Sequence, residues 1–341
     1  MTQEPQDVAR AVKLLQAGEL VAFPTETVYG LGADAANPAA VARIFTVKGR
    51  PVDHPLIVHL PGAAHLDRWA STIPATAWEL AEAFWPGPLT LILKRSPEAP
   101  NAVTGGQETI GVRVPAHPLA LDLLRTYAQA GGGRGGMCGI AAPSANRFGR
   151  ISPTTAAHVH QELGESVGLV LDGGPCSVGI ESTIIDLSRD GDLAPRLLRP
   201  GRITAEQIAL VIGVRPVMAE SGKDEALPRV PGALESHYAP QTPLRLVQTP
   251  RLATVIGEVQ DKSQRCGLLA RTRRTFAVPP HVQRQLPDEA TAYARGLYAA
   301  LRELDQLGND FIVVEDVPGD PAWAAVADRL RRAAGGAGNK D

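Results

Sequence analysis

Short apolar segments alternate with longer amphipathic segments along most of this 341-residue chain, and this alternation constrains its fold more than any other feature. The clearest apolar runs of strand length are residues 20–23, 55–60, 89–94 and 109–114. Segments with helical periodicity, such as residues 118–129, separate these runs. Strands that alternate with helices are typical of an α/β fold. We therefore predict an N-terminal α/β domain with a twisted mixed sheet over residues 1–214.

The chain changes character after residue 214. Residues 215–243 carry prolines at short intervals and little periodicity, which is typical of a linker. Strand-like and helix-like segments then alternate again over residues 244–334, which predicts a smaller Rossmann-like α/β domain. The linker ends in His237-Tyr238-Ala239-Pro240, which is unusually specific for a connection, so we expect it to do more than join two domains.

Composition excludes several classes of protein. The formal net charge of −2 lacks the basic excess of a general nucleic-acid binder. Cys138, Cys176 and Cys266 are too few and too scattered for a disulfide framework, which favours a reducing, cytoplasmic compartment. Residues 1–10 are polar and lack the apolar core of a secretory signal, and no apolar run approaches the ~18 residues that span a membrane.

One apparent cofactor motif fails on its context. Gly131, Gly133 and Gly136 match G-x-G-x-x-G, but the run follows a predicted helix and precedes a predicted strand. A dinucleotide fingerprint needs the opposite order, so we interpret residues 131–136 as an inserted loop and expect no tightly bound organic cofactor. We also find no P-loop and no His pair with metal-ligand spacing, and therefore expect no protein-held metal.

Two cations flank a glycine where a predicted helix ends, in Lys48-Gly49-Arg50-Pro51, with His54 close behind. Cations at the C-terminal end of a helix interact favourably with the helix dipole, which would explain Lys48 and Arg50 on structural grounds alone. The alternative is a clamp for a polyphosphate, because arginine forks onto phosphate oxygens and lysine adds a mobile charge.

A single arginine lies on a strand that is otherwise apolar. Alternation places Thr109, Gly111 and Arg113 on one face of the 109–114 strand. A buried guanidinium needs an anionic partner, because an unpaired buried charge is costly. That partner could be Asp34, another internal acid or a ligand carboxylate.

Further hydroxyl and amide side chains follow a predicted strand that ends at Ala142. Ser144 and Asn146 offer hydrogen bonds there, and Ser152 stands where it could cap a helix over residues 153–163. Gly179-Ile180-Glu181-Ser182 and Leu198-Arg199-Pro200-Gly201 place similar groups beside other strands. Hydroxyls, cations and glycines at strand ends favour phosphate chemistry, in which positioning and charge neutralisation do most of the catalysis.

Eight strings, in this order and spacing, resemble the YrdC/Sua5 family over nearly the whole chain: PTETVYGLG, KGRP, PLIVH, WPGPLT, APSAN, GIESTI, LRPG and HYAP. The resemblance implies an L-threonylcarbamoyladenylate synthase, a nucleotidyltransferase that forms threonylcarbamoyl-AMP and pyrophosphate from L-threonine, bicarbonate or CO2, and ATP. The product would serve the t6A modification beside the tRNA anticodon. ATP would carry Mg2+, and the product would pass to the tRNA threonylcarbamoyl transferase machinery, with no tight binding of tRNA itself and no membrane.

The resemblance also assigns residues. Those expected to contact L-threonine are Thr27, His59, Arg113, Ala142 and Ser182. Those expected to contact ATP are Arg50, His54, Thr109, Ser144, Asn146, Ser152, Arg199 and Tyr238. Lys48 and Arg50 would neutralise charge at the triphosphate, and the HYAP segment would act as a lid over the product.

The linker departs from the family pattern, since it reads Pro-Gly-Ala-Leu-Glu-Ser-His-Tyr where many relatives carry Met-Lys-Tyr after Pro-Gly. Two alternatives come from other functional classes. One is an RNA-binding module, against which the net charge and the few aromatic residues argue. The other is a carbamoyltransferase like the related module of hydrogenase-maturation proteins, which carry acylphosphatase and zinc-finger modules that this sequence lacks.

Overall fold

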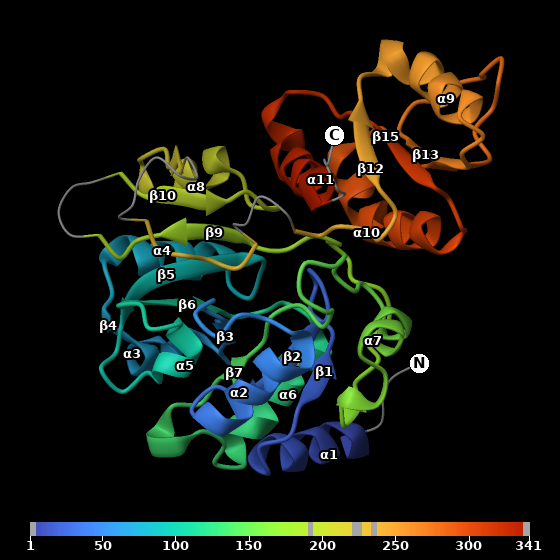
Figure 1. Ribbon diagram of the computed structural model, residues 1–341. Helices are drawn as coiled ribbons and strands as arrows, with labels where there is room; N and C mark the ends of the chain where they lie inside the picture. Colours follow the sequence, from blue (N-terminus) through green and yellow to red (C-terminus); the bar gives the residue numbers. More distant parts are fainter. Residues whose placement is uncertain (1–4, 190–193, 220–226, 233–236, 337–341) are drawn as a thin grey trace. The chain divides into compact units, whose positions relative to one another are not determined.

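The computed structural model describes residues 5–189, 194–219, 227–232 and 237–336 (Figure 1). The chain divides into two compact units. The first comprises residues 1–148, 153–177 and 181–233, and the second comprises residues 149–152, 178–180 and 234–341. The bounds predicted from sequence follow chain order, and so they could not assign the two short inner segments to the second unit.

The first unit is built on a mixed sheet, as predicted. Among the described residues the sheet has 11 strands in the order β11-β10-β9-β5-β6-β3-β7-β2-β1-β8, with β4 paired to β5. The strands are β1 (Val21–Phe23), β2 (Gly30–Asp34), β3 (Ile57–His59), β4 (Ala70–Thr72), β5 (Leu89–Arg95), β6 (Thr109–Arg113), β7 (Ile140–Ala141), β8 (Leu169–Val170), β9 (Thr183–Asp186), β10 (Arg196–Arg199) and β11 (Val217–Met218).

Helices pack on both faces of this sheet. They are α1 (Pro5–Gln16), α2 (Pro38–Lys48), α3 (Leu66–Trp69), α4 (Ala75–Phe84), α5 (Asn101–Thr104), α6 (Pro118–Gln129), α7 (Ala156–Leu163) and α8 (Ala205–Ile212). Helices α1 and α6 contribute to one core cluster with Val21, Phe23 and Ile140. The larger core cluster contains the alternate strand residues, such as Ala22 and Ala141, and so occupies the opposite face.

Strand register divides the middle of the sheet into an apolar face and a polar one. Val58, Val112 and Leu91 are paired neighbours on β3, β6 and β5, and all three belong to the larger core. The adjacent residues on these strands therefore face the other way. His59 is paired with Arg113, and the β5–β6 register places Thr90 across from Arg113. Three polar side chains thus meet on one face of three central strands.

Residues 30–34, for which no strand was predicted, form the fully buried strand β2. One prediction about local structure was wrong. Ser152 was expected to cap a helix from residue 153, but α7 begins at Ala156 and Thr155 caps it by accepting a hydrogen bond from the His158 amide. The glycines of residues 131–136 follow α6 and precede β7, as the sequence order required.

The second unit carries a parallel four-stranded sheet in the order β12-β15-β13-β14. Its strands are β12 (Leu244–Val247), β13 (Cys266–Ala270), β14 (Val282–Gln285) and β15 (Phe311–Glu315), and its helices are α9 (Leu252–Asp261), α10 (Ala290–Gln306) and α11 (Ala324–Gly336). A small parallel sheet connected by helices confirms the predicted Rossmann-like architecture. No helix in the described part of the chain is long and apolar enough to cross a membrane.

Candidate functional site

Arg113, at the end of β6, is the centre of a buried polar cluster. Its Nη2 donates to Glu26 Oε1 at 2.6 Å, its Nη1 to Thr27 Oγ1 at 3.0 Å and its Nε to the Gly87 carbonyl at 3.1 Å. Both charged side chains are buried, with 4% of Arg113 and 8% of Glu26 exposed. The anionic partner that the sequence demanded is therefore Glu26, whereas Asp34 accepts a hydrogen bond from the Ala36 amide instead.

The loop between β1 and β2 holds Glu26 and Thr27 in place through its own hydrogen bonds. Thr25 Oγ1 lies 2.7 Å from Thr27 Oγ1 and donates to the Val28 carbonyl at 2.7 Å. Glu26 Oε2 accepts from the Ala116 amide at 3.0 Å, beyond the end of β6. Every residue of this loop is buried, so the two side chains reach Arg113 from a rigid support.

His59 lies beside Arg113 on β3 and is itself buried. Burial, with a smaller contribution from the Arg113 charge, lowers the pKa of His59 to about 3, so the imidazole is neutral near pH 7. Its Nδ1 is buried and has no hydrogen-bond partner among the described residues. Because buried ring nitrogens are normally hydrogen-bonded, this one is suited to a ligand.

A second polar cluster connects strands β5, β9 and β10. Ser182 Oγ, just before β9, lies 2.8 Å from Thr90 Oγ1 and accepts from Arg199 Nη2 at 3.0 Å. Arg199 Nη1 donates to the Pro231 carbonyl at 2.9 Å. Since Thr90 lies across from Arg113, Ser182 joins the Arg113 cluster to Arg199 and to the linker.

The linker segment 229–231 is fixed to the first unit beside this cluster. The amide of Arg229 donates to Gln107 Oε1 at 2.7 Å, and Gln107 Nε2 donates to the Arg229 carbonyl at 3.1 Å. Val230 packs with Ile57, Ile92 and Ile184 in a small apolar cluster. This part of the linker therefore borders the same polar face.

Lys48, at the end of α2, is buried and donates to two backbone carbonyls, those of Ser144 at 2.5 Å and of Asn146. Burial lowers the pKa of Lys48 well below its ordinary value, and the charge of Arg50 adds to this effect. The lysine expected to neutralise phosphate charge thus also fixes the loop that carries Ser144 and Asn146.

Arg50 and His54 surround the ring of Phe148. The Arg50 guanidinium carbon lies 5.7 Å from the ring centroid, and Arg50 Nη2 donates to the Pro55 carbonyl at 3.0 Å. The His54 ring meets Phe148 edge-on at 5.4 Å. Burial and the Arg50 charge lower the pKa of His54. Two residues that were predicted to contact ATP are thus held around one aromatic ring.

The remaining predicted residues of the first unit lie on, or directly after, strands of the same sheet. Ala142 follows β7 and donates its amide to the Ile57 carbonyl at 3.0 Å. Thr109 begins β6, four residues before Arg113 and on the same face, which corresponds to about 13 Å along a strand. Gly111 lies between them, where an added Cβ would meet Ile92 at 3.1 Å, so the strand presents a flat surface there.

Ser152 and Tyr238 belong to the second unit. Ser152 is fully buried. Tyr238, with a φ of 62°, stacks on Tyr298 at 5.8 Å and lies under the Arg329 guanidinium, 5.3 Å from the ring centroid. The adjacent Ala239 donates its amide to the Gly149 carbonyl at 2.9 Å. The HYAP segment is therefore anchored within the second unit.

Sequence reasoning missed two members of the site. Glu26 lies inside the PTETVYGLG string beside the predicted Thr27, but nothing in the string identifies it as the partner of Arg113. Thr90 is one hydroxyl in an apolar strand, and only the β5–β6 register reveals that it lies across from Arg113.

Comparison with known proteins identifies the family of this chain. The Sua5/YciO/YrdC family model, described as "Telomere recombination", matches residues 13–201, and a model described as "Threonylcarbamoyl-AMP synthase, C-terminal domain" matches residues 203–335. The chain belongs to this family. Members similar to it are the threonylcarbamoyl-AMP synthases of Bacillus subtilis (42% identity, 98% of this chain and 94% of that protein) and Pyrococcus abyssi (40%, 95% and 93%).

A solved structure supports the same assignment. The crystal structure of P. abyssi Sua5 complexed with L-threonine superposes with a TM-score of 0.88 at 37% identity, covering 98% of this chain and 96% of that one. The shared fold therefore extends over both units of this family member. Among the described residues, no group of three or more His, Cys, Asp or Glu side chains could hold a metal ion.

Proposed function

We propose that this protein is an L-threonylcarbamoyladenylate synthase, which forms threonylcarbamoyl-AMP and pyrophosphate from L-threonine, bicarbonate or CO2, and ATP. The observation that carries the proposal is the Arg113 cluster, in which a buried guanidinium and the unpartnered Nδ1 of His59 lie side by side on one sheet face. The enzyme names of the two relatives and the bound threonine of the P. abyssi structure supply the substrate.

The threonine end of the site consists of Arg113 with Thr27, His59, Ala142 and Ser182. Arg113 uses three of its five N–H groups on protein partners and keeps two for the substrate carboxylate. The neutral His59 ring accepts or donates one hydrogen bond without adding a second positive charge. When the site holds both the carboxylate and the hydroxyl of L-threonine, the direction of the substrate amine is fixed.

The ATP end is assembled from cations and hydroxyls of neighbouring loops. In this proposal Lys48, Arg50 and Arg199 neutralise and orient the phosphates, and His54, whose lowered pKa leaves it uncharged near pH 7, offers a hydrogen bond. The list is completed by Thr109, Ser144, Asn146, Ser152 and Tyr238. Lys48 acts mainly by holding the Ser144–Asn146 loop, since its ammonium already donates to two carbonyls there. Mg2+ arrives on the nucleotide phosphates, because the residues gathered here supply positive charge and hydroxyls rather than a carboxylate cage.

The reaction has two steps. The amine of L-threonine attacks CO2 and loses a proton, which gives a carbamate. One carbamate oxygen then attacks the α-phosphorus of ATP, the bond to the β-phosphate oxygen breaks, and pyrophosphate leaves. No side chain forms a covalent intermediate, so the protein contributes alignment and charge neutralisation. The product passes to the tRNA threonylcarbamoyl transferase machinery of the cytoplasm, and tRNA itself is not held tightly.

The linker serves as a lid in this proposal, with segment 229–231 fixed near the site and the HYAP segment closing over the labile adenylate. Deletion of residues 232–240 is expected to lower the yield of intact product more than the rate of pyrophosphate release, because an open site admits water. An unchanged yield would exclude the lid.

The direct test is pyrophosphate release with ATP and bicarbonate, with and without L-threonine, followed by mass analysis of the nucleotide product. Threonine-dependent release and the mass of threonylcarbamoyl-adenylate are expected, and both should be lost in Arg113→Gln. Release that is independent of threonine would contradict the proposal.

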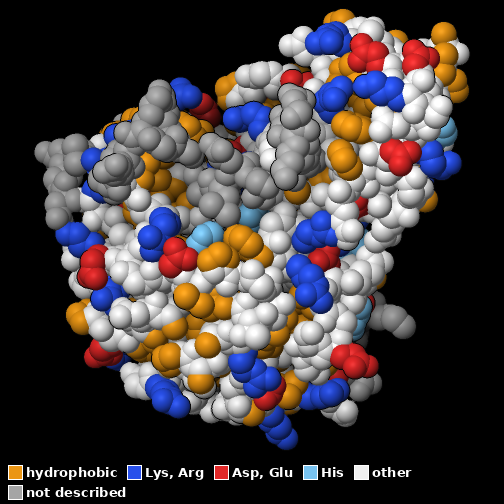
Figure 2. All heavy atoms as spheres, viewed as in Figure 1, with side chains coloured by type: hydrophobic (Ala, Val, Ile, Leu, Met, Phe, Trp, Pro, Cys, Tyr) orange, Lys and Arg blue, Asp and Glu red, His pale blue; other side chains and the backbone are white. Residues whose placement is uncertain are grey.

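The same preparation tests the two alternatives. A carbamoyltransferase would use carbamoyl phosphate as donor, and an RNA-binding module would shift tRNA in a salt-dependent way without turnover of ATP. On the face shown in Figure 2, basic and acidic side chains of the described residues are interspersed rather than gathered into one basic area. This distribution favours the enzyme over the RNA-binding module.

A further inference from the structure

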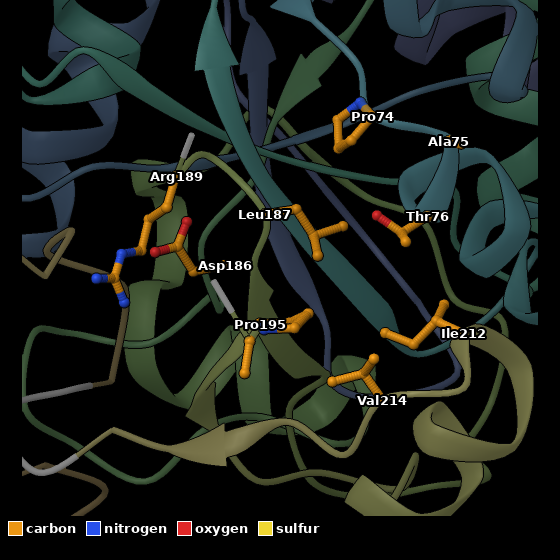
Figure 3. Close-up of a pocket in the computed structure, with 10 residues that line it drawn as sticks. Pro74, Ala75, Thr76, Asp186, Leu187, Arg189, Pro195, Ile212 and Val214 are labelled. Atoms are coloured by element: carbon orange, nitrogen blue, oxygen red, sulfur yellow. The ribbon is translucent and has the colours of Figure 1, made fainter. Parts of the chain in front are cut away.

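The first unit contains a cavity at the end of β9 that the synthase reaction does not use. Its volume is about 350 Å³, and it lies between the start of α4, the end of β9, the start of β10 and the end of α8 (Figure 3). Asp186 lines it, four residues beyond Ser182 along the strand, which corresponds to about 13 Å. None of the residues that line it belongs to the polar clusters described above, so the cavity is a separate site.

Asp186 brings an unsatisfied negative group to this cavity. Its side chain is 1% exposed, and Oδ1 accepts from the Ser188 amide at 2.9 Å and from Ser188 Oγ at 2.6 Å. Oδ2 has no hydrogen-bond partner among the described residues. A buried carboxylate oxygen without a donor costs free energy, and a small rotation about the Cβ–Cγ bond would present it to a donor in the cavity. A primary ammonium is a donor of matching charge.

Arg189 brings a positive group to the same side of the cavity. Figure 3 shows Asp186 and Arg189 together on one side, with Thr76 and Ile212 across from them. Arg189 is exposed and forms no hydrogen bond or ion pair with any other described residue. The cavity thus carries two opposite charges close together, and the rest of the described protein satisfies neither the guanidinium nor Asp186 Oδ2.

The remaining wall is largely apolar. Leu187, Pro195 and Ile212 line it, together with the first residues of α4. Pro74 precedes α4 without a side-chain cap, so the first-turn amides of that helix favour a carboxylate nearby. Few polar groups on an apolar wall are typical of a small-molecule site, and this volume is at the small end of such sites.

We propose that this cavity binds an aliphatic α-amino acid. The ammonium would donate to Asp186, the carboxylate would pair with Arg189 and the start of α4, and the side chain would lie against Leu187, Pro195 and Ile212. Adjacent opposite charges on the protein match a ligand whose ammonium and carboxylate are both attached to one carbon. The proposal concerns a second site and is independent of the synthase reaction.

Calorimetric titration of the full chain with L-leucine tests this site. Binding is expected for wild type, and it should be at least about tenfold weaker for 3-methylbutylamine or 4-methylpentanoate, each of which lacks one charge. Asp186→Asn and Arg189→Gln are each expected to weaken L-leucine binding about tenfold or more. Asp67→Asn, an exposed carboxylate on α3, makes the same charge change as Asp186→Asn and should leave binding unaltered.

One further variant, Arg113→Gln, and the exposed position of Arg189 keep the test decisive. Arg113→Gln should retain L-leucine binding, which separates this cavity from the threonine end of the proposed active site. Arg189 is exposed, so Arg189→Gln keeps the fold even if Asp186→Asn melts early. No binding at about 10 mM L-leucine, binding unchanged by Arg189→Gln, or binding lost in Arg113→Gln would overturn the proposal.

Discussion

Glu26 and Arg113 form a buried ion pair with 2.6 Å between Oε1 and Nη2, in the middle of the proposed threonine site. A substrate carboxylate must therefore bind a guanidinium that already has a counter-charge. The pair keeps Arg113 buried and oriented when no ligand is present, because an isolated charge at this depth would be strongly disfavoured. Glu26 is thus a positioning residue for the arginine that recognises the substrate.

Replacing Glu26 by glutamine should show this dependence. The change keeps the shape but removes the counter-charge, so Glu26→Gln is expected to lower the free energy of unfolding by about 3 kcal/mol. L-Threonine should stabilise this variant more than it stabilises wild type, because its carboxylate restores the missing charge. Thermal melts with and without L-threonine measure both effects.

The matched control is Glu108→Gln, which breaks the pair between Glu108 and Arg95, where 85% of Glu108 is exposed. Exposed pairs contribute little, so a change below about 1 kcal/mol is expected. Equal destabilisation of the two variants would show that the buried pair has no special role.

Arg113→Lys tests the geometry of the guanidinium rather than its charge. Lysine cannot reach Glu26, Thr27 and the Gly87 carbonyl at once and still hold a carboxylate in a fork. We expect kcat/KM for L-threonine to fall about 100-fold, while KM for ATP changes by less than about threefold. Steady-state kinetics with each substrate varied in turn decides this, and an equal rise of both KM values would contradict the assignment.

Sequence patterns predicted those helices and strands whose own residues show a clear apolar or amphipathic pattern. Strands β5 and β6 were predicted within one residue because each is centred on apolar residues and bounded by turn-forming sequence. Strand β2 was missed, since glycines disfavour strands. An added Cβ at Gly32 would lie 2.8 Å from Phe23 and 2.9 Å from Ile140, so this glycine is required by close packing that only the fold reveals.

The site shows the same division between local and long-range information. Ser152-Pro153 has the sequence of a helix start, yet the Pro153 carbonyl accepts from the Tyr29 amide at 2.9 Å, and this contact keeps the segment out of the helix. The need of Arg113 for an anion was evident from its strand. The choice of Glu26 over Asp34 depends on the path of the loop after β1, which no short-range pattern encodes.

Ser182→Ala should affect both substrates at once. Its hydroxyl joins Thr90 on the threonine side to Arg199 on the ATP side. Loss of this link is expected to raise both KM values by about tenfold to a hundredfold, which corresponds to one hydrogen bond to a charged group. Thr90→Val removes only the Thr90 contact and should leave KM for ATP within about twofold. A change in only one substrate for Ser182→Ala would show that the two clusters act independently.

His59 makes the pH dependence of stability predictable. Its pKa is about 3 in the folded protein and 6.5 when unfolded, so the unfolded chain binds the extra proton between these values. Its contribution to stability is therefore fully present above pH 6.5 and is lost as pH falls toward 3, by up to about 1.4 kcal/mol per pH unit. Denaturant unfolding of wild type and His59→Gln from pH 7.5 to pH 5 compares the two slopes, and the variant should lose less stability on acidification because glutamine does not titrate. Parallel slopes would mean that His59 has the same pKa in the folded and unfolded protein, which would contradict a ring kept neutral by burial beside Arg113.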